Sequence, residues 1–146
     1  MPVRRASVSL KRHPALLARR IILRHEKLVY ILVADRKLNY ENGRSKVVYI
    51  GTTKLGGARI AQSVATRAES ILTRHGVMEF EARTVTCRGR QRVKMWRKLE
   101  RALLLMFKEV FDEIPKCNIH GKNYRETDEF EYFAKSRLKR VLEDVS

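Results

Sequence analysis

LVYILV at residues 28–33 and VVYI at residues 47–50 decide the fold of this chain. Both runs are apolar and rich in β-branched and aromatic side chains, which is typical of buried strands. The polar segment between them, Asp35 to Ser45, contains Asn42-Gly43, a dipeptide that favours tight turns. Two strands joined in this way predict an antiparallel hairpin, and we expect Gly51 to end the second strand.

The remaining pattern adds a third strand and three helices. After the Gly56-Gly57 break, apolar residues at helical spacing predict a helix that ends at His75-Gly76. Residues 78–84 alternate between apolar or small and charged side chains, which predicts a strand. Apolar stripes predict a long helix over about 91–111 and a last helix near 128–142, with Thr127 or Asp128 as its cap. This order, without a regular βαβ alternation, indicates an α+β fold.

A chain of 146 residues has room for one compact domain. Residues 1–26 are expected to form a basic N-terminal arm, because no acidic residue precedes Glu26 and the segment lacks the apolar core of a secretory signal. A short helix within it, from Ala15 to about Arg24, would begin after Pro14. Residues 27–120 are expected to form the core, and residues 121–146 a C-terminal helical extension of the same domain.

The charge of the chain indicates its partner. Lys and Arg number 32 against 16 Asp and Glu, which gives a formal net charge of +16. An excess of this size in a small domain favours binding to nucleic acid through phosphate contacts. No apolar run approaches the length of a membrane span. Two cysteines are too few for a disulfide framework, so we expect a cytoplasmic protein.

Glu100 is the most informative single residue. It lies four residues after Trp96 and seven before Phe107, so helical spacing places it within an apolar stripe. A carboxylate in that position is costly unless it is compensated. Either a divalent metal such as Mg²⁺ or an ion pair with one of the many arginines would compensate it.

The other candidate residues also have two readings. Arg59 begins a helix after a glycine pair, where it can hold a phosphate or remain a solvated surface residue. Tyr30 and Tyr49 lie in the apolar strands, where they can pack the core or present hydroxyls that orient or deprotonate a water molecule. Asn118 follows the long helix and would by itself be read as a turn residue.

Taken in order, these residues resemble the GIY-YIG nuclease superfamily. Residues 28–30 are similar to the first signature tripeptide, and residues 49–51 contain the second one intact. Arg59 stands ten residues after the start of that tripeptide, where the family has its essential arginine. Glu100 lies in the place of the family's metal-binding glutamate, and residues 115–118 resemble the Pro-x-x-Asn end of the family core.

The chain departs from the family pattern at three positions. Leu28 replaces the glycine of the first tripeptide, and Thr52 stands where many members have a lysine, for which Lys54 is the candidate substitute. Ser63 replaces the tyrosine or histidine often found one helical turn after Arg59. These departures favour, as an alternative, a nucleic-acid-binding module that keeps the fold without the chemistry.

The resemblance implies a three-stranded antiparallel sheet flanked by helices and a DNA endonuclease activity. It implies one Mg²⁺ or Mn²⁺ ion on Glu100, water activated or positioned by Tyr49 or Tyr30, phosphate charge stabilised by Arg59, and a supporting role for Asn118. The expected partner is double-stranded DNA, with an RNA substrate as an alternative, and a homodimer would allow one site per subunit to cut both strands. The residues expected to contact nucleic acid are Lys54, Arg67, Arg90 and Arg92.

Overall fold

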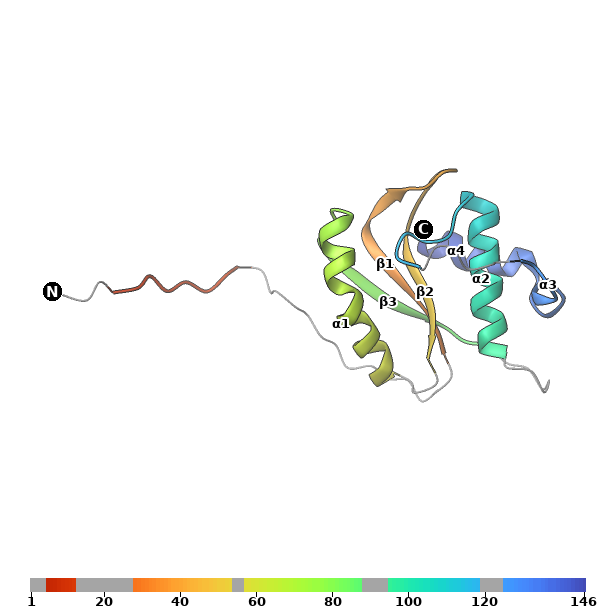
Figure 1. Ribbon diagram of the computed structural model, residues 1–146, viewed down its shortest axis with the longest axis horizontal. Helices are drawn as coiled ribbons and strands as arrows, with labels where there is room; N and C mark the ends of the chain where they lie inside the picture. Colours follow the sequence, from red (N-terminus) through yellow and green to blue (C-terminus); the bar gives the residue numbers. More distant parts are fainter. Residues whose placement is uncertain (1–4, 13–27, 54–56, 88–94, 119–124) are drawn as a thin grey trace.

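The computed structural model describes residues 5–12, 28–53, 57–87, 95–118 and 125–146. Within this part the chain is α+β, with a three-stranded antiparallel sheet and four helices (Figure 1). The predicted helix over 15–24 lies outside the described residues. The elements in order are β1 (Leu28–Asn39), β2 (Arg44–Thr53), α1 (Gly57–Arg74), β3 (Phe80–Val85), α2 (Met95–Phe111), α3 (Glu129–Tyr132) and α4 (Lys135–Val145).

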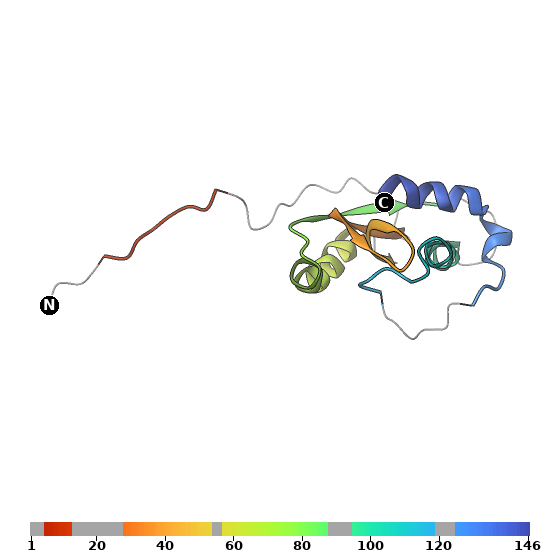
Figure 2. The same cartoon turned by 90° about the horizontal axis from the view of Figure 1, so that it is seen from above.

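The strand β1 is the centre of the sheet. The strand order is β2-β1-β3, and both neighbours pair with β1 in antiparallel fashion. Side chains on both faces of β1 are buried, including those of Tyr30 and Ile31. Successive strand residues point to opposite faces, so both faces must be covered. Figure 2 shows the cover, with α1 on one side of the strands and α4 on the other.

The predicted hairpin between β1 and β2 is confirmed. Gly43 has a φ of 94°, which favours glycine, and its carbonyl oxygen accepts a hydrogen bond of 2.9 Å from the Tyr40 amide. The Asn42 side chain donates a hydrogen bond of 2.8 Å to the Val110 carbonyl oxygen near the end of α2. The turn is therefore fastened to the helix that carries Glu100.

Three predicted strand boundaries are wrong. The strand β1 continues beyond Val33 to Asn39, because the segment expected to be polar buries Leu38. The strand β2 continues past Gly51, because Thr52 pairs with Val29 of β1. The strand β3 begins only at Phe80, and Met78, expected on its apolar face, is 83% exposed. The ends of β2 and β3 are therefore set by pairing with β1, and not by the local sequence pattern.

The predicted single C-terminal helix is also wrong. It divides into α3 and α4 at Phe133 and Ala134, both of which have extended backbone angles. Asp128 precedes α3 but makes no side-chain cap, because its carboxylate binds Lys98 of α2 at 2.5 Å. The two pieces have separate anchors, since α3 is fixed through Glu129 and α4 through its buried leucines, Leu138 and Leu142.

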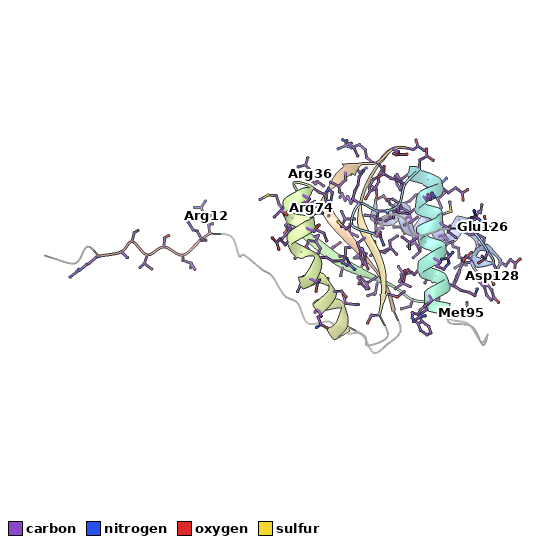
Figure 3. All side chains as sticks on the ribbon, viewed as in Figure 1. Arg12, Arg36, Arg74, Met95, Glu126 and Asp128 are labelled. Atoms are coloured by element: carbon purple, nitrogen blue, oxygen red, sulfur yellow. The ribbon has the colours of Figure 1, made fainter. Side chains whose placement is uncertain are left out.

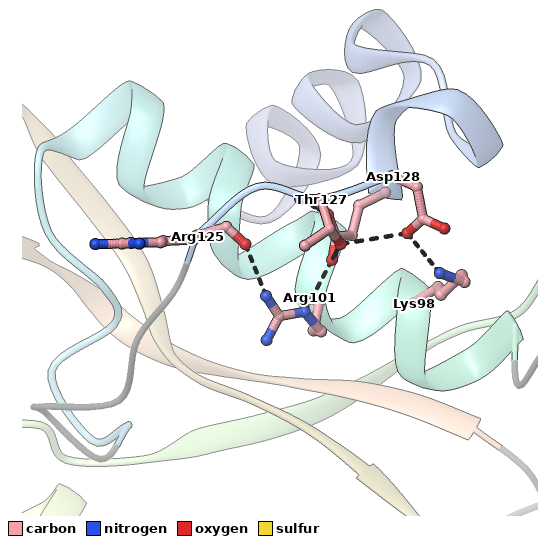
Figure 4. Close-up of polar contacts among 6 residues, drawn as sticks. Lys98, Arg101, Arg125, Thr127 and Asp128 are labelled. Carbon is pink, nitrogen blue, oxygen red and sulfur yellow. Dashed lines mark hydrogen bonds and ion pairs between the residues drawn. The ribbon is translucent and has the colours of Figure 1, made fainter.

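Glu129 lies in a buried ion-pair network that the sequence did not predict. It is 1% exposed, and its carboxylate accepts a hydrogen bond of 2.9 Å from Arg101 Nε and one of 2.8 Å from the Thr127 amide. Arg101 also donates to the Arg125 carbonyl oxygen at 2.9 Å (Figure 4). Burial alone would raise the pKa of Glu129, but these hydrogen bonds outweigh it and lower the pKa to about 2.

Acid is therefore expected to loosen this network. The pKa of Glu129 is about 2 in the fold against an ordinary 4.5, so its stabilisation is full above about pH 4.5 and is lost as the pH falls toward 2. The shift corresponds to at most about 3 kcal/mol. Urea unfolding of Glu129→Gln should lose most of this pH dependence, whereas Glu131→Gln, at an exposed position of α3, should keep it. Equal pH profiles for wild type and Glu129→Gln would contradict the assignment.

Candidate active site

Gly51 makes room for the two tyrosines of the hairpin. Tyr30 of β1 pairs with Gly51 of β2, and the rings of Tyr30 and Tyr49 lie 5.8 Å apart between centroids. A Cβ atom added to Gly51 would stand 2.6 Å from Cε1 of Tyr49 and 2.9 Å from both Cζ and the hydroxyl oxygen of Tyr30. Because Tyr30 is 2% exposed, its ring has little space to move. Glycine is thus required here by side-chain packing.

Arg67 of α1 covers the Tyr49 ring. Its Cζ lies 3.9 Å from the ring centroid, and its Nη2 donates a hydrogen bond of 2.9 Å to the Tyr49 hydroxyl. The sequence predicted Arg67 as a contact to nucleic acid, and the structure shows its side chain half-buried against Tyr49. Helical spacing could have indicated this burial, because Arg67 lies seven residues after the buried Ile60 and four before the buried Ile71.

The phenol of Tyr49 is a weak acid in this environment. Burial raises its pKa to about 12, and the neighbouring Tyr30 and the negative charge of Glu100 add to that effect. The positive charge of Arg67 opposes it. Tyr49 therefore keeps its proton at neutral pH and acts as a hydrogen-bonding group.

Glu100 lies in the first half of α2. Its side chain is half-buried, and its negative charge contributes to the raised pKa of Tyr49, so the two groups interact electrostatically. In the described part of the chain, no three His, Cys, Asp or Glu side chains gather as metal ligands. Mg²⁺ needs no such cluster, because it is commonly bound by one or two carboxylates and retains several water molecules. The donor chemistry of Glu100 fits such an ion.

Asn118 closes the outer edge of β2. Its side chain accepts a hydrogen bond of 3.0 Å from the Ile50 amide and donates one of 2.9 Å to the Ile50 carbonyl oxygen. The neighbouring Cys117 amide donates to the Val48 carbonyl oxygen at 2.9 Å. The supporting residue predicted from the sequence thus holds the backbone between Tyr49 and Gly51.

The two hydrogen bonds between the Asn118 side chain and the backbone of Ile50 form a clasp, and removing this clasp should destabilise the fold. Asn118→Leu leaves the amide and carbonyl of Ile50 without these partners, and a loss of about 2–4 kcal/mol in unfolding free energy is expected. Chemical denaturation measures the loss. Asn39→Leu, at an exposed position of β1, is the control and should change stability little. A loss for Asn118→Leu no larger than that of the control would contradict this role.

A shallow depression lies on α1 beside Tyr49. Its volume is about 240 Å³, and the described residues that line it are Gln62, Ser63, Thr66 and Arg67. Arg36 and Arg74 lie at one end of α1, whereas Glu126 and Asp128 lie on the far side of α2 (Figure 3). The depression is therefore on the side away from these two acidic residues.

Of the predicted site residues, Tyr30 and Tyr49 lie side by side, Asn118 binds the backbone of Ile50 next to Tyr49, and the charge of Glu100 acts on Tyr49. The side chain of Arg59, in the first turn of α1, lies outside the described part of the structure. The same holds for the three predicted DNA contacts Lys54, Arg90 and Arg92.

Comparison with known proteins adds no relative. No family model, no curated protein and no solved structure matches the chain. None of the helices in the described ranges has the length and apolar character needed to cross a lipid bilayer. The assignment of function therefore depends on the residues of the site.

Proposed function

We propose that this chain is a metal-dependent endonuclease of the GIY-YIG type that hydrolyses phosphodiester bonds of DNA. The observation that carries the proposal is the packing of Tyr30 against Tyr49 on a strand that Asn118 fastens, with the charge of Glu100 acting on Tyr49. These residues come from four separate parts of the chain and match the order of the resemblance. Ordinary core packing does not require a half-buried carboxylate whose charge acts on a buried phenol.

Tyr49, which is only half-buried, is suited to holding a water molecule, and the buried Tyr30 supports its ring. Because Arg67 donates to the Tyr49 hydroxyl, that hydroxyl keeps its own proton to donate, and the neighbouring Tyr30 is one acceptor for it. In the proposed reaction, water attacks phosphorus, one P–O ester bond breaks, and the leaving oxygen gains a proton while the attacking water loses one. Tyr49 would orient the water, and its high pKa argues against a phenolate base at neutral pH.

Glu100 is the residue that would hold Mg²⁺ or Mn²⁺. A bound divalent ion supplies Lewis acidity and makes water more acidic, which compensates for the absence of a strong base among the tyrosines. The remaining coordination positions would belong to water and to substrate oxygens. The residues of the chain position the reactants, and we assign the clamp on the scissile phosphate to Arg59 by the resemblance.

DNA is the proposed substrate because the chain carries a formal net charge of +16. Such a charge attracts the dense phosphates of a duplex, and binding should weaken steeply as salt is raised. The raised pKa of Tyr49 and the serine at position 63 favour a second candidate, a binding module of the same fold without catalysis.

Plasmid cleavage tests the two candidates directly. The purified full chain is incubated with supercoiled plasmid and with single-stranded RNA, in Mg²⁺, Mn²⁺ or EDTA. An endonuclease should nick the plasmid with either metal and not in EDTA. Duplex binding without cleavage under any metal would refute the nuclease and support the binding module, whereas cleavage of RNA alone would reassign the substrate.

A further inference from the structure

Arg67 has far fewer partners than its chemistry requires. A guanidinium carries five N–H donors, and among the described residues Arg67 makes one hydrogen bond, from Nη2 to the Tyr49 hydroxyl. Its Nε is buried and has no hydrogen-bond partner within the described ranges. No carboxylate of the described residues forms an ion pair with it. Buried donors are normally satisfied, so this one indicates a missing acceptor.

Arg101 shows what a structural arginine looks like in the same fold. Its Nε donates to the buried carboxylate of Glu129, and its Nη2 donates to the Arg125 carbonyl oxygen. The two arginines therefore differ in kind. Arg101 is paired with an internal anion, whereas Arg67 stacks on an aromatic ring and makes no internal ion pair among the described residues.

The depression next to Arg67 has the lining that an anion requires. Gln62, Ser63 and Thr66 offer an amide and two hydroxyls, and no carboxylate is among its described lining residues. The Thr66 hydroxyl donates to the Gln62 carbonyl oxygen. The Ser63 hydroxyl and the guanidinium of Arg67 are the natural donors to a ligand, and a guanidinium matches the oxygens of a phosphate in geometry and charge.

We propose that this depression is a phosphate subsite in which Arg67 binds one phosphodiester of a nucleic-acid strand, next to the phosphate held at Tyr49. The phosphate would meet the outer edge of the guanidinium first, and a small turn of that group would bring Nε within reach. Because Nη2 remains on the Tyr49 hydroxyl, a strand bound here would be aligned with the two tyrosines. The nucleic-acid identity of the ligand rests on the proposed function, and the phosphate chemistry does not.

Nitrogen-15 NMR of the full chain tests the subsite without any cleavage. The Nε–Hε signal of Arg67 is assigned by its loss in Arg67→Lys and is followed in EDTA during titration with inorganic phosphate or with a short DNA duplex. The signal should shift with both ligands, while the Nε–Hε signal of Arg101 should stay in place. Arg137→Gln, at an exposed arginine of α4, is the matched control and should leave the Arg67 response unchanged.

Duplex affinity gives a second measurement. Arg67→Gln should weaken binding about tenfold and reduce the salt slope by about one phosphate contact. A silent Arg67 signal with both ligands would overturn the subsite even if the plasmid is cut. A signal that moves with inorganic phosphate but not with duplex would overturn its assignment to a nucleic-acid strand. A signal that moves with duplex in a protein that never cuts DNA would support the subsite and refute the nuclease separately.

Discussion

Replacing Glu100 with glutamine should lower the rate of Mg²⁺-dependent plasmid cleavage by about a hundred- to a thousandfold. A neutral amide of the same size keeps the packing of α2 but removes the charge that would hold the metal, and a metal contributes several kcal/mol to such reactions. Cleavage rates at saturating plasmid measure the loss, and duplex binding in EDTA should be unchanged or slightly tighter.

Glu109→Gln is the matched control for that experiment. Glu109 lies on the same helix, and its ion pair with Lys135 is half-exposed, so its replacement should alter neither cleavage nor binding. Wild-type cleavage by Glu100→Gln would refute the metal-binding role of Glu100. Loss of folding in that variant, detected by circular dichroism, would instead assign to Glu100 a structural ion pair.

Gly51→Ala should disable the site through packing alone. The added Cβ meets the rings of Tyr30 and Tyr49 at less than 3 Å, so at least one ring must move. Overpacking of this kind costs about 1–3 kcal/mol, and we expect cleavage to fall at least about a hundredfold because small displacements of positioned groups are that costly. Thermal unfolding and plasmid cleavage measure the two losses.

A double variant separates packing from chemistry. Gly51→Ala with Tyr30→Leu removes the crowded ring, so it should recover part of the lost stability without recovering cleavage. Thr52→Ser, next to Gly51, is the control and should retain most of both. An alanine at position 51 that leaves stability and cleavage unchanged would show that the tyrosine rings are free to move.

The fold was predictable from the sequence where the local pattern and the tertiary structure agree. The turn at Asn42-Gly43 and the long buried stripe of α2 are cases in which turn geometry or helical periodicity alone decides the outcome. Strand ends were not predictable, because β1 supplies partners to Thr52 and Thr53 whatever their own propensity. The break between α3 and α4 was not predictable either, because the apolar residues on both sides of Phe133 continue the helical spacing without interruption.

The candidate site was predictable as a set of residues but not as a set of contacts. Tyr30, Tyr49, Glu100 and Asn118 could be named from order and spacing. The coupling of Arg67 to Tyr49 needed the packing of α1 across the sheet, because the spacing along α1 alone does not show which strand residue that arginine meets. The clasp of Asn118 on Ile50 joins residues 68 apart, a distance over which no local pattern operates.

The clasp made by Asn118 also has a consequence for solubility. An uncovered edge strand presents unpaired amides and carbonyls that recruit strands from other molecules, and β2 is rich in the β-branched residues that favour such pairing. By occupying the amide and carbonyl of Ile50, one asparagine side chain blocks the growth of the sheet at that edge. Asn118 thus both supports the proposed catalytic strand and protects its edge from aggregation. A substitution of Asn118 that weakens the strand should therefore also make the protein more prone to aggregate.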